Sequence, residues 1–369
     1  MRIAYVLTSL GVGGAERQAL ALAERMAARG HAVSLVVLRG RLPEEWATAL
    51  DPGCIVRLGM RRTPSSLLTG LAKARHFLRD FQPDLIHSHT YPANMVARLL
   101  GISFPAAAVL STVHNVYEGP WPRMLAYRLS DGLSCRTIAV SQAAAVRYVR
   151  LKAVPAHKSS VLTNGIDTAE FTPSSDSRAR MREEMGAGDE FVWLAAGRIA
   201  PAKDYPNLLR AFAQVRAECA EARLWIAGEG QGAKLAAVQA LAAELGASVR
   251  WLGLRRDMPA LLDAADGFVL ASAWEGMPLA VGEAMAMEKP VVATDVGGVR
   301  ELVGESGVIV PAKTPEGLAQ SMLTLMWSTP EPRRSLGRGA RERILNLFSI
   351  DAKADEWEVL YKALLAQMK

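Results

Sequence analysis

The segment GFVLASAWEGMPLAVGEAMAMEKPVVA, residues 267–293, contains the parts of one strand–helix–strand unit. Gly267–Leu270 and Val291–Ala293 are short and apolar, which is typical of buried strands. Between them, Pro278 suits the first position of a helix, and an apolar run follows it. A strand, a helix and a second strand in this order form a parallel pair joined by a right-handed crossover. The segment therefore predicts an open parallel sheet covered by helices.

The same alternation runs along the whole chain in two sets. The first set of β-rich runs comprises Ile3–Leu7, Val33–Leu38, Leu85–His87, Val109–Val113, Thr137–Val140 and Ser160–Leu162. The second set comprises Val192–Ala196, Leu224–Ala227, Val249–Leu252, Gly267–Leu270, Val291–Ala293 and Val308–Val310. Two sets predict two doubly wound α/β domains, and 369 residues are enough to give each domain its own core. Asn164–Asp189 has the composition of a linker, so we expect one domain over 1–170 and the other over 171–350.

The end of the chain predicts one more helix, over about 351–369. An apolar stripe at helical spacing is formed by Trp357, Leu360, Tyr361, Leu364 and Met368. Such a stripe must pack against other apolar residues. Two partners are open: the core of the second domain, or the first domain, to which the helix would return.

Composition excludes several classes of protein. Hydrophobic residues make up 50% of the chain and charged residues 22%, as in a globular protein and not a disordered one. No run approaches the roughly 20 apolar residues of a membrane-spanning helix, and the apolar start is too short for a signal peptide. The three cysteines are widely spaced and odd in number, which fits a reducing compartment. We therefore expect a cytoplasmic protein.

The positive charge of the chain is concentrated in its first half. Residues 1–170 carry 20 Lys and Arg against 11 Asp and Glu, and residues 171–369 carry 23 against 26. This asymmetry favours an anionic surface as a partner of the first half, while a solvated basic face is an equal alternative. The basic stretches lack interleaved aromatic residues and nucleic-acid motifs, so nucleic acid is not an expected partner.

In the first half, candidate ligand-binding residues follow predicted strands, where open α/β sheets bind their ligands. Gly13 and Gly14 follow the first strand and open a helix, whose N-terminus offers free N–H groups to an anion; a tight turn is the simpler alternative. His114 and Asn115 end the apolar run 106–113. A single histidine in such a place is more often structural than catalytic.

In the second half, two loops carry charged residues. Arg198 and Lys203 follow the first strand of the second set and could clamp a diphosphate, Arg bidentately and Lys as a point charge. Two solvated surface cations are the alternative. Glu275 precedes the helix that starts at Pro278. There it could bind sugar hydroxyls, or it could merely interact with the helix dipole. Glu283 lies inside the helix. A carboxylate on so apolar a helix needs a partner, and a vicinal diol would provide one.

Taken in order, these motifs resemble the family-4 retaining glycosyltransferases, which have the GT-B fold. In the second half the resemblance rests on Gly197–Lys203, Ile226–Gly230, Trp251–Gly253, Ala265–Leu270, the pair Glu275 and Glu283, Lys289–Gly298, Glu301 and Val308–Pro311. In the first half it rests on Gly13–Glu16, His87–His89, His114-Asn115, Val140-Ser141 and Asn164–Asp167. The resemblance implies two Rossmann-like domains facing across a cleft, the first for the acceptor and the second for a nucleotide sugar.

The resemblance also implies roles for individual residues. Arg198 and Lys203 would bind the donor diphosphate, and Glu275 the transferred sugar. Glu283 would bind the ribose diol, and His114 would lie near the donor sugar. Further donor contacts would come from Gly13, Gly14, Gly228, Gly276, Met277, Pro278 and Leu279. Acceptor contacts would come from Glu16, His89 and Asn115. One departure bears on the clamp loop: residue 204 is Asp, where the family often has Gly.

The expected activity is transfer of a hexose or N-acetylhexosamine from a nucleotide diphosphate sugar, UDP favoured over GDP. The acceptor would be a glycan or lipid-linked glycan of a cell-surface polysaccharide. The family needs neither metal nor cofactor, in agreement with the lack of a D-x-D element. No second carboxylate is placed as a nucleophile, so we expect same-face attack with retention of configuration. A GT-B epimerase or phosphorylase and, from another class, a two-lobed sugar-binding protein remain alternatives.

One predicted helix in the basic half has the pattern of a helix that lies on a membrane. Its apolar face comprises Leu67, Leu68, Leu71, Ala74 and Leu78. The basic residues in and before it are Arg57, Arg61, Arg62, Lys73, Arg75 and Arg79. This pattern suits peripheral contact with the inner face of the cytoplasmic membrane. A core-facing helix with a basic solvent side is an equal alternative.

Overall fold

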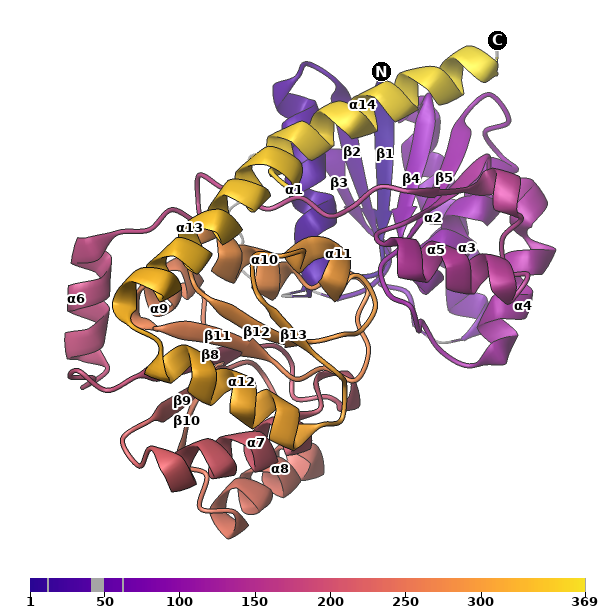
Figure 1. The fold of residues 1–369 in the computed structure, drawn as a ribbon. Helices are drawn as coiled ribbons and strands as arrows, with labels where there is room; N and C mark the ends of the chain where they lie inside the picture. Colours follow the sequence, from indigo (N-terminus) through magenta and orange to yellow (C-terminus); the bar gives the residue numbers. More distant parts are fainter. Residues whose placement is uncertain (12, 41–49, 62, 369) are drawn as a thin grey trace. The chain divides into compact units, whose positions relative to one another are not determined.

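A computed structural model of the chain describes residues 1–11, 13–40, 50–61 and 63–368, and Figure 1 shows its helices and strands. These residues form two compact units. The first comprises Met1–Gly165 and Ile350–Lys369, and the second comprises Ile166–Ser349. Arg62 of the predicted basic cluster lies outside the described residues.

The first unit is built on a parallel sheet of seven strands in the order β3-β2-β1-β4-β5-β6-β7. The strands are β1 (Arg2–Leu7), β2 (Ala32–Val37), β3 (Ile55–Arg57), β4 (Leu85–His89), β5 (Ala108–Val113), β6 (Arg136–Ala139) and β7 (Ser159–Val161). The helices between them are α1 (Gly14–Ala28), α2 (Pro64–Phe81), α3 (Tyr91–Gly101), α4 (Trp121–Leu129) and α5 (Gln142–Arg150). The six predicted strands are present, and β3 is an additional short strand at the edge.

Helices cover both faces of this sheet because alternate residues of a strand point to opposite sides. On β1, Ile3 and Tyr5 pack into one core together with α1, whereas Ala4 and Val6 pack into a second core together with α2 and α3. All four side chains are completely buried. Strands buried on both faces read as continuous apolar runs, which is why they were visible in the sequence.

The C-terminal helix α14 (Ile350–Gln367) belongs to the first unit. Trp357, Tyr361 and Leu364 are buried in the core that contains Ile3 and Leu35. Figure 1 shows α14 in yellow along the strands of the first sheet. Of the two partners that the sequence left open, the helix packs on the first domain.

The second unit is built on a parallel sheet of six strands in the order β10-β9-β8-β11-β12-β13. The strands are β8 (Val192–Ala196), β9 (Arg223–Ala227), β10 (Val249–Gly253), β11 (Gly267–Leu270), β12 (Val291–Thr294) and β13 (Val308–Val310). The helices are α6 (Ser175–Glu184), α7 (Tyr205–Glu218), α8 (Gly232–Glu244), α9 (Met258–Ala264), α10 (Leu279–Ala286), α11 (Val299–Val303), α12 (Pro315–Trp327) and α13 (Pro330–Leu347). All six predicted strands of this set are present.

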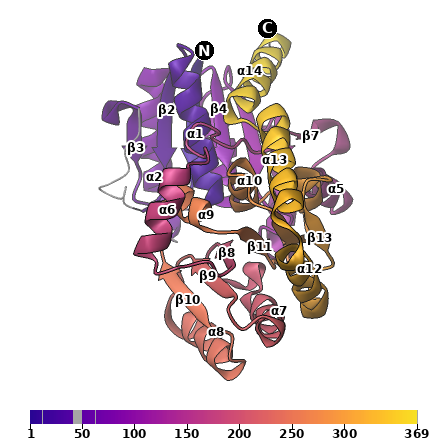
Figure 2. The ribbon, with the colours of Figure 1, turned by 60° about the vertical axis from the view of Figure 1, so that its left-hand side comes forward.

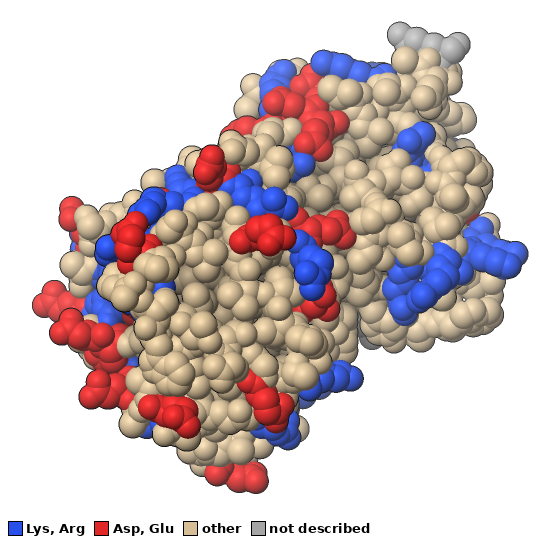
Figure 3. Space-filling view, viewed as in Figure 1, with Lys and Arg blue, Asp and Glu red and all other residues tan. Residues whose placement is uncertain are grey.

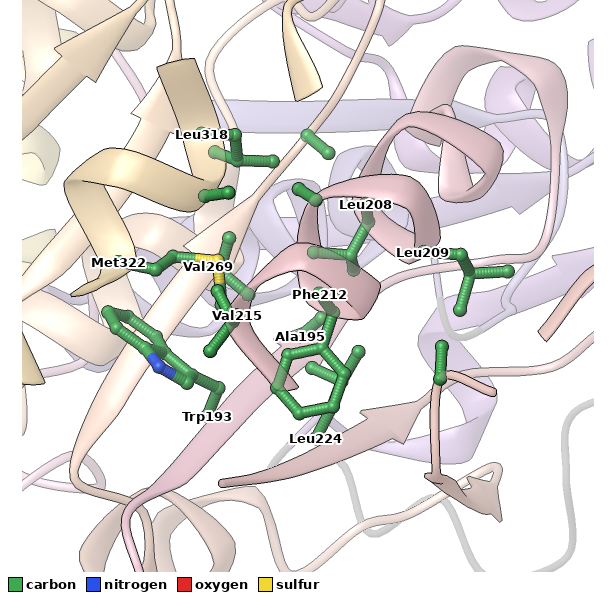
Figure 4. Close-up of a cluster of buried hydrophobic side chains, with 14 of the residues drawn as sticks. Trp193, Ala195, Leu208, Leu209, Phe212, Val215, Leu224, Val269, Leu318 and Met322 are labelled. Carbon is green, nitrogen blue, oxygen red and sulfur yellow. The ribbon is translucent and has the colours of Figure 1, made fainter. Parts of the chain in front are cut away.

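One core of the second unit lies between its sheet and helices α7 and α12. Figure 4 shows Phe212 of α7 directed toward Ala195 and Leu224 of the sheet, and Met322 of α12 near Val269. On another side of the unit, α13 packs against α10 (Figure 2). This packing fixes the strand ends from which the loops of the unit emerge.

The stretch expected to be a linker, Asn164–Asp189, contains the boundary between the two units, at Gly165 and Ile166, but it also contains a helix that the sequence did not predict. Ser174 caps α6 by accepting a hydrogen bond from Ser177 N–H. Arg178 and Arg182 of α6 then form ion pairs with Asp266, at 2.6 and 3.0 Å. The helix is held by these arginines and buries only Met181 of its own residues, so it lacks the apolar stripe that would have revealed it.

Part of the apolar stripe of α2 packs into the core of the first unit. Ala74 and Leu78 are completely buried beneath the sheet, whereas Leu68 is 68% exposed. This agrees with the second of the two alternatives for α2, since the buried residues are occupied by intramolecular packing. Among the described residues, no helix has the length and apolar character needed to cross a membrane.

Candidate functional site

In the second unit, the loops that follow β8, β9 and β11 are joined by backbone hydrogen bonds. Ile199 N–H donates to the carbonyl oxygen of Glu229 at 2.8 Å, and Ala273 N–H donates to that of Ala202 at 2.8 Å. The loop that carries Lys203 is therefore fixed to the loop that carries Glu275. Both loops lie at the carboxyl ends of parallel strands, where such sheets bind their ligands.

Lys203 and Glu275 form an ion pair at the centre of these loops. The Lys203 Nζ lies 2.6 Å from Oε1 of Glu275, and Ser272 Oγ donates to the same oxygen at 2.7 Å. Glu275 is only 7% exposed, so the two partners fix the orientation of a buried carboxylate. Arg198, which the sequence predicted as a second clamp residue, is exposed on the same loop. The structure thus brings Lys203 to Glu275 and leaves Arg198 at the surface.

The departure at residue 204 has a backbone explanation. Asp204 has φ +43° and ψ +50°, which is the left-handed conformation that favours glycine. Aspartate tolerates this conformation better than most residues. The loop therefore turns into α7 at Asp204 as a glycine would allow.

Helix α10 begins at Leu279, one residue after the predicted start at Pro278, and contains the second glutamate. Glu283 lies within α10 and is 4% exposed. Met277 and Pro278 are buried ahead of the helix, and Gly298 N–H donates to the carbonyl oxygen of Gly276 at 2.7 Å. Leu279, the first residue of the helix, is half-buried.

Gly228 is required by the close approach of two loop backbones. A Cβ at this position would clash with the carbonyl oxygen of Gly197. That oxygen accepts a hydrogen bond from Tyr205 Oη at 2.6 Å. We expect Gly228→Ala to push the clamp loop away, lower the free energy of unfolding by about 1–3 kcal/mol and weaken nucleoside diphosphate binding. Thermal unfolding and titration with UDP measure both effects.

The matched control for this substitution is Gly339→Ala, on α13 of the same unit. An added Cβ at Gly339 meets no described atom within 4 Å. Alanine is the better helix former by up to about 1 kcal/mol, so this variant should be as stable as the parent or more so. Equal UDP affinity in all three proteins would contradict the close-approach argument.

In the first unit, a shallow hollow too narrow to hold a water molecule lies at the carboxyl ends of β1 and β4. Its lining comprises Leu7, Thr8, Ala15, Glu16, His89 and Thr90. Gly13 precedes α1 as its N-cap without a capping side chain, and Gly14 is exposed at its first position. Glu16 curls back over this N-terminus and accepts a hydrogen bond from Ser9 Oγ at 3.1 Å. The carboxylate thereby occupies the end of the helix that an anion would otherwise favour.

Two histidines meet beside the hollow. His89 Nδ1 lies 2.9 Å from His114 Nε2. Burial lowers the pKa of His114 to about 3 and that of His89 well below 6.5, so both rings are neutral at physiological pH. The other ring nitrogen of His89, Nε2, is buried without a hydrogen-bond partner among the described residues. A neutral imidazole has one donor and one acceptor nitrogen and can hydrogen-bond to a hydroxyl group in either direction.

Thr90 is a residue of the hollow that the sequence did not reveal. Its φ of +70° is rare for a β-branched residue and indicates local strain. The hydroxyl of Thr90 lies 2.8 Å from that of Thr8, and both line the hollow. Asn115, in contrast, uses its Oδ1 to accept from Tyr117 N–H within its own turn.

Side chains of the C-terminal helix α14 contact β4, the strand that carries His89. Tyr361 Oη lies 2.7 Å from His87 Nδ1, and His87 Nε2 lies 2.7 Å from Thr112 Oγ1. The His87 ring packs against Trp357 at 4.7 Å and against His89 at 4.2 Å between ring centres. Residues from the far end of the chain thus fix the strand that carries His89. Sequence spacing held no signal for this contact.

Two family models match the chain. The one described as Glycosyltransferase Family 4 matches residues 12–170, and the one described as Glycosyl transferases group 1 matches residues 190–327. Among curated proteins, EpsD of Bacillus subtilis, named as a glycosyltransferase, is 30% identical over 298 residues, which cover 77% of each chain. The D-inositol 3-phosphate glycosyltransferase of Thermobispora bispora is 30% identical over 364 residues, covering 89% of this chain and 85% of that protein.

Solved structures share the whole fold. The sucrose-phosphate synthase of Thermosynechococcus elongatus aligns over 100% of both chains with a TM-score of 0.86 and 21% identity. Anabaena HepE in complex with UDP-glucose aligns over 98% of this chain and 99% of its own, with a TM-score of 0.84 and 22% identity. Together with the two parallel sheets, these alignments confirm the predicted GT-B fold class.

Proposed function

Because the chain belongs to glycosyltransferase family 4, we propose that it transfers a hexose or N-acetylhexosamine from a nucleotide diphosphate sugar with retention of configuration. The observation that carries this proposal is the ion pair of Lys203 with Glu275. A cation next to a carboxylate, at the ends of β8 and β11, suits a ligand that has a diphosphate beside a hydroxyl-rich sugar.

The proposed donor contacts lie on the loops of the second unit. Lys203 and Arg198 would bind the diphosphate, and Glu275 the hydroxyls of the sugar. Glu283 would bind the ribose diol. UDP is the favoured base, because UDP and UDP-glucose complexes are known for HepE, which has this fold. A relative named as GDP-mannose-dependent, with which the chain shares 31% identity over 195 residues, makes GDP the alternative to test.

The proposed mechanism follows from the charges that develop as the donor breaks. Departure of the nucleoside diphosphate places negative charge on its phosphates, which Lys203 and Arg198 would stabilise without a metal or cofactor. The acceptor hydroxyl would attack from the face that the diphosphate leaves, with a phosphate oxygen taking its proton. His114, whose ring is neutral, would donate or accept a hydrogen bond at the sugar without adding charge.

A donor screen tests the proposal. Thermal unfolding with UDP, GDP and their sugars should show one nucleotide that raises the midpoint by several degrees, since ligands stabilise the folds they bind. Mass spectrometry should then show transfer of one sugar to a glycan or lipid-linked glycan acceptor. Binding of free sugars and no nucleotide would contradict the proposal and favour a sugar-binding protein. Donor isomerisation without an acceptor would favour an epimerase.

We also propose a lipid-linked acceptor used at the inner face of the cytoplasmic membrane, which the first unit contacts through helices α4 and α5. On α4, Trp121 and Leu129 are 68% and 78% exposed, whereas Met124 and Tyr127 are buried. On α5, Val146 is 54% exposed. Exposed aromatic and aliphatic side chains of this size suit a lipid surface.

Basic residues accompany these exposed apolar side chains, which favours an anionic lipid surface. Arg128, Arg150 and Lys152 are exposed on α4 and at the end of α5. Figure 3 shows Lys and Arg side chains gathered over the part of the first unit where α5 and α4 lie. Each basic residue near an anionic surface contributes about 1 kcal/mol to binding. This surface is an alternative to α2, whose apolar stripe is partly buried.

Liposome binding separates the two surfaces. The variant Arg128→Glu/Arg150→Glu should bind vesicles of anionic phospholipid about tenfold or more weakly than the parent, with binding that declines with salt. Arg75→Glu/Arg79→Glu, with the same charge change on exposed positions of α2, is the matched control and should bind as the parent does. Co-sedimentation measures both. If the parent protein does not bind anionic vesicles even at low salt, membrane contact is refuted. If the α2 variant binds vesicles more weakly than the parent, the membrane-binding surface includes α2.

A further inference from the structure

Glu118 lies on the loop between β5 and α4, and its carboxyl group faces hydrogen-bond donors. Its Oε1 accepts from the backbone N–H of His114 at 2.9 Å, and its Oε2 accepts from Tyr127 Oη at 3.1 Å. The hydroxyl of Tyr148 is close to the same carboxyl but has no hydrogen-bond partner among the described residues. An ionised carboxylate, whose oxygens only accept, satisfies these donors together.

Charged and titratable groups face Glu118 from each element around it. They are Arg123 and Tyr127 of α4, Tyr148 of α5 and His114 of the loop itself; Arg98 of α3 acts on Tyr127, and Arg147 of α5 acts on Tyr148. Arg123 donates to the backbone oxygen of Glu118 and favours the ionised carboxyl. Burial opposes ionisation and is the larger effect, so the pKa of Glu118 rises to about 7. The neighbouring phenols titrate far above this value and His114 far below it.

His114 is therefore held at two points. Its imidazole meets His89 at 2.9 Å, and its backbone meets Glu118 at 2.9 Å. The first anchor sets the direction of the ring, and the second sets the position of the backbone from which the ring projects. A ring displaced by a fraction of an ångström makes poorer hydrogen bonds in a transition state.

We propose that Glu118 is a positioning residue for glycosyl transfer, whose ionised carboxylate fixes the backbone of His114 and hence its imidazole. The inference rests on the proposed function, because that function gives His114 a part in the transfer. A protonated carboxyl accepts hydrogen bonds more weakly than a carboxylate, and the backbone N–H of His114 can only donate. Protonation therefore weakens the bond to His114, the loop is held less firmly, and turnover falls.

The transfer rate should rise with pH while the stability of the fold falls. A group with a pKa of about 7 is about one-tenth ionised at pH 6 and about nine-tenths ionised at pH 8, so kcat should rise up to about tenfold. Glu118 in the unfolded chain titrates near 4.5, so between about pH 4.5 and 7 the folded state binds more protons. Raising the pH through that window therefore destabilises the fold. If Glu118 had a purely structural role, kcat would change with pH in the same direction as stability. The positioning role instead predicts that kcat rises while stability falls.

Glu118→Gln tests the inference, because the amide imitates the protonated acid at every pH. Its kcat should match the low-pH rate of the parent and change less than about twofold from pH 6 to 8. Tyr127→Phe is a second variant that keeps the carboxyl and removes one of its donors, so the midpoint of its rate profile should move to higher pH. Persistence of the parental rise in Glu118→Gln, or an unmoved midpoint in Tyr127→Phe, would overturn the inference.

The same measurements separate this inference from the proposed function. Thermal unfolding from pH 5 to 8 is recorded for each protein alongside the rate with UDP-sugar and acceptor. Absence of turnover with every nucleotide sugar in the parent protein would refute the proposed function, and the positioning role with it. Turnover with a pH dependence that Glu118→Gln leaves intact would refute the positioning role alone.

Discussion

Replacing Lys203 with alanine is expected to lower kcat/KM for the nucleotide sugar by about 10²- to 10³-fold, the usual effect of removing one preorganised charge donor. The Lys203 Nζ is held 2.6 Å from Glu275, on a loop whose turn is set by Asp204. It therefore needs little rearrangement to meet the phosphates as they gain charge. Steady-state kinetics with the donor found in the screen measure the effect.

Two controls make the Lys203 result specific. Lys234→Ala removes an exposed lysine of α8 in the same unit and should leave kcat/KM unchanged. Lys203→Ala also leaves Glu275 buried without its ion pair, so thermal unfolding must be compared as well. A fall in kcat/KM of less than about tenfold, which is 1.4 kcal/mol, would show that Lys203 is not a diphosphate clamp.

Glu275→Gln and Glu283→Gln should fail in different ways. Glu275→Gln should lower kcat by about 10- to 100-fold, the worth of a hydrogen bond to a charged group, and leave UDP affinity the same or higher. UDP affinity is maintained because the substitution releases Lys203 from its ion pair. Glu283→Gln should weaken UDP itself, because a ribose contact is present in the ground state and the transition state alike.

Titration calorimetry with UDP, alongside kcat for each variant, distinguishes the two glutamates. Glu244→Gln, an exposed position of α8, is the control for the loss of one negative charge. Equal loss of UDP affinity in the variants at 275 and 283 would refute the division of roles. Such a result would place both carboxylates at the nucleotide.

The sequence predicted the strands well because both sheets are parallel and covered by helices. Each buried strand of such a sheet is an apolar run with turn residues on both sides. The strand that escaped, β3 (Ile55–Arg57), is three residues long and only partly buried at an edge. Helix α6 escaped because arginines and not an apolar stripe attach it to the unit.

The sequence predicted which loops carry the site residues, but not which of these residues contact one another. Loops at the carboxyl ends of strands contain Lys203, Glu275 and His114, as expected from the topology. That Lys203 touches Glu275, 72 residues further along, depends on how two strands pair. The strain at Thr90 and the hydrogen bonds that Glu118 accepts are also properties of the folded chain, without a pattern of their own in the sequence.

The position of α14 in the chain has a consequence for protein synthesis. On the ribosome the first unit emerges early, but the helix that covers Tyr5 and Leu22 is translated only after the entire second unit, residues 166–349. At about 5–20 residues per second this interval lasts roughly ten to forty seconds. During that time helix α1 alone covers this apolar face of the nascent sheet, so we expect the part later covered by Trp357 and Tyr361 to stay exposed and available to a chaperone.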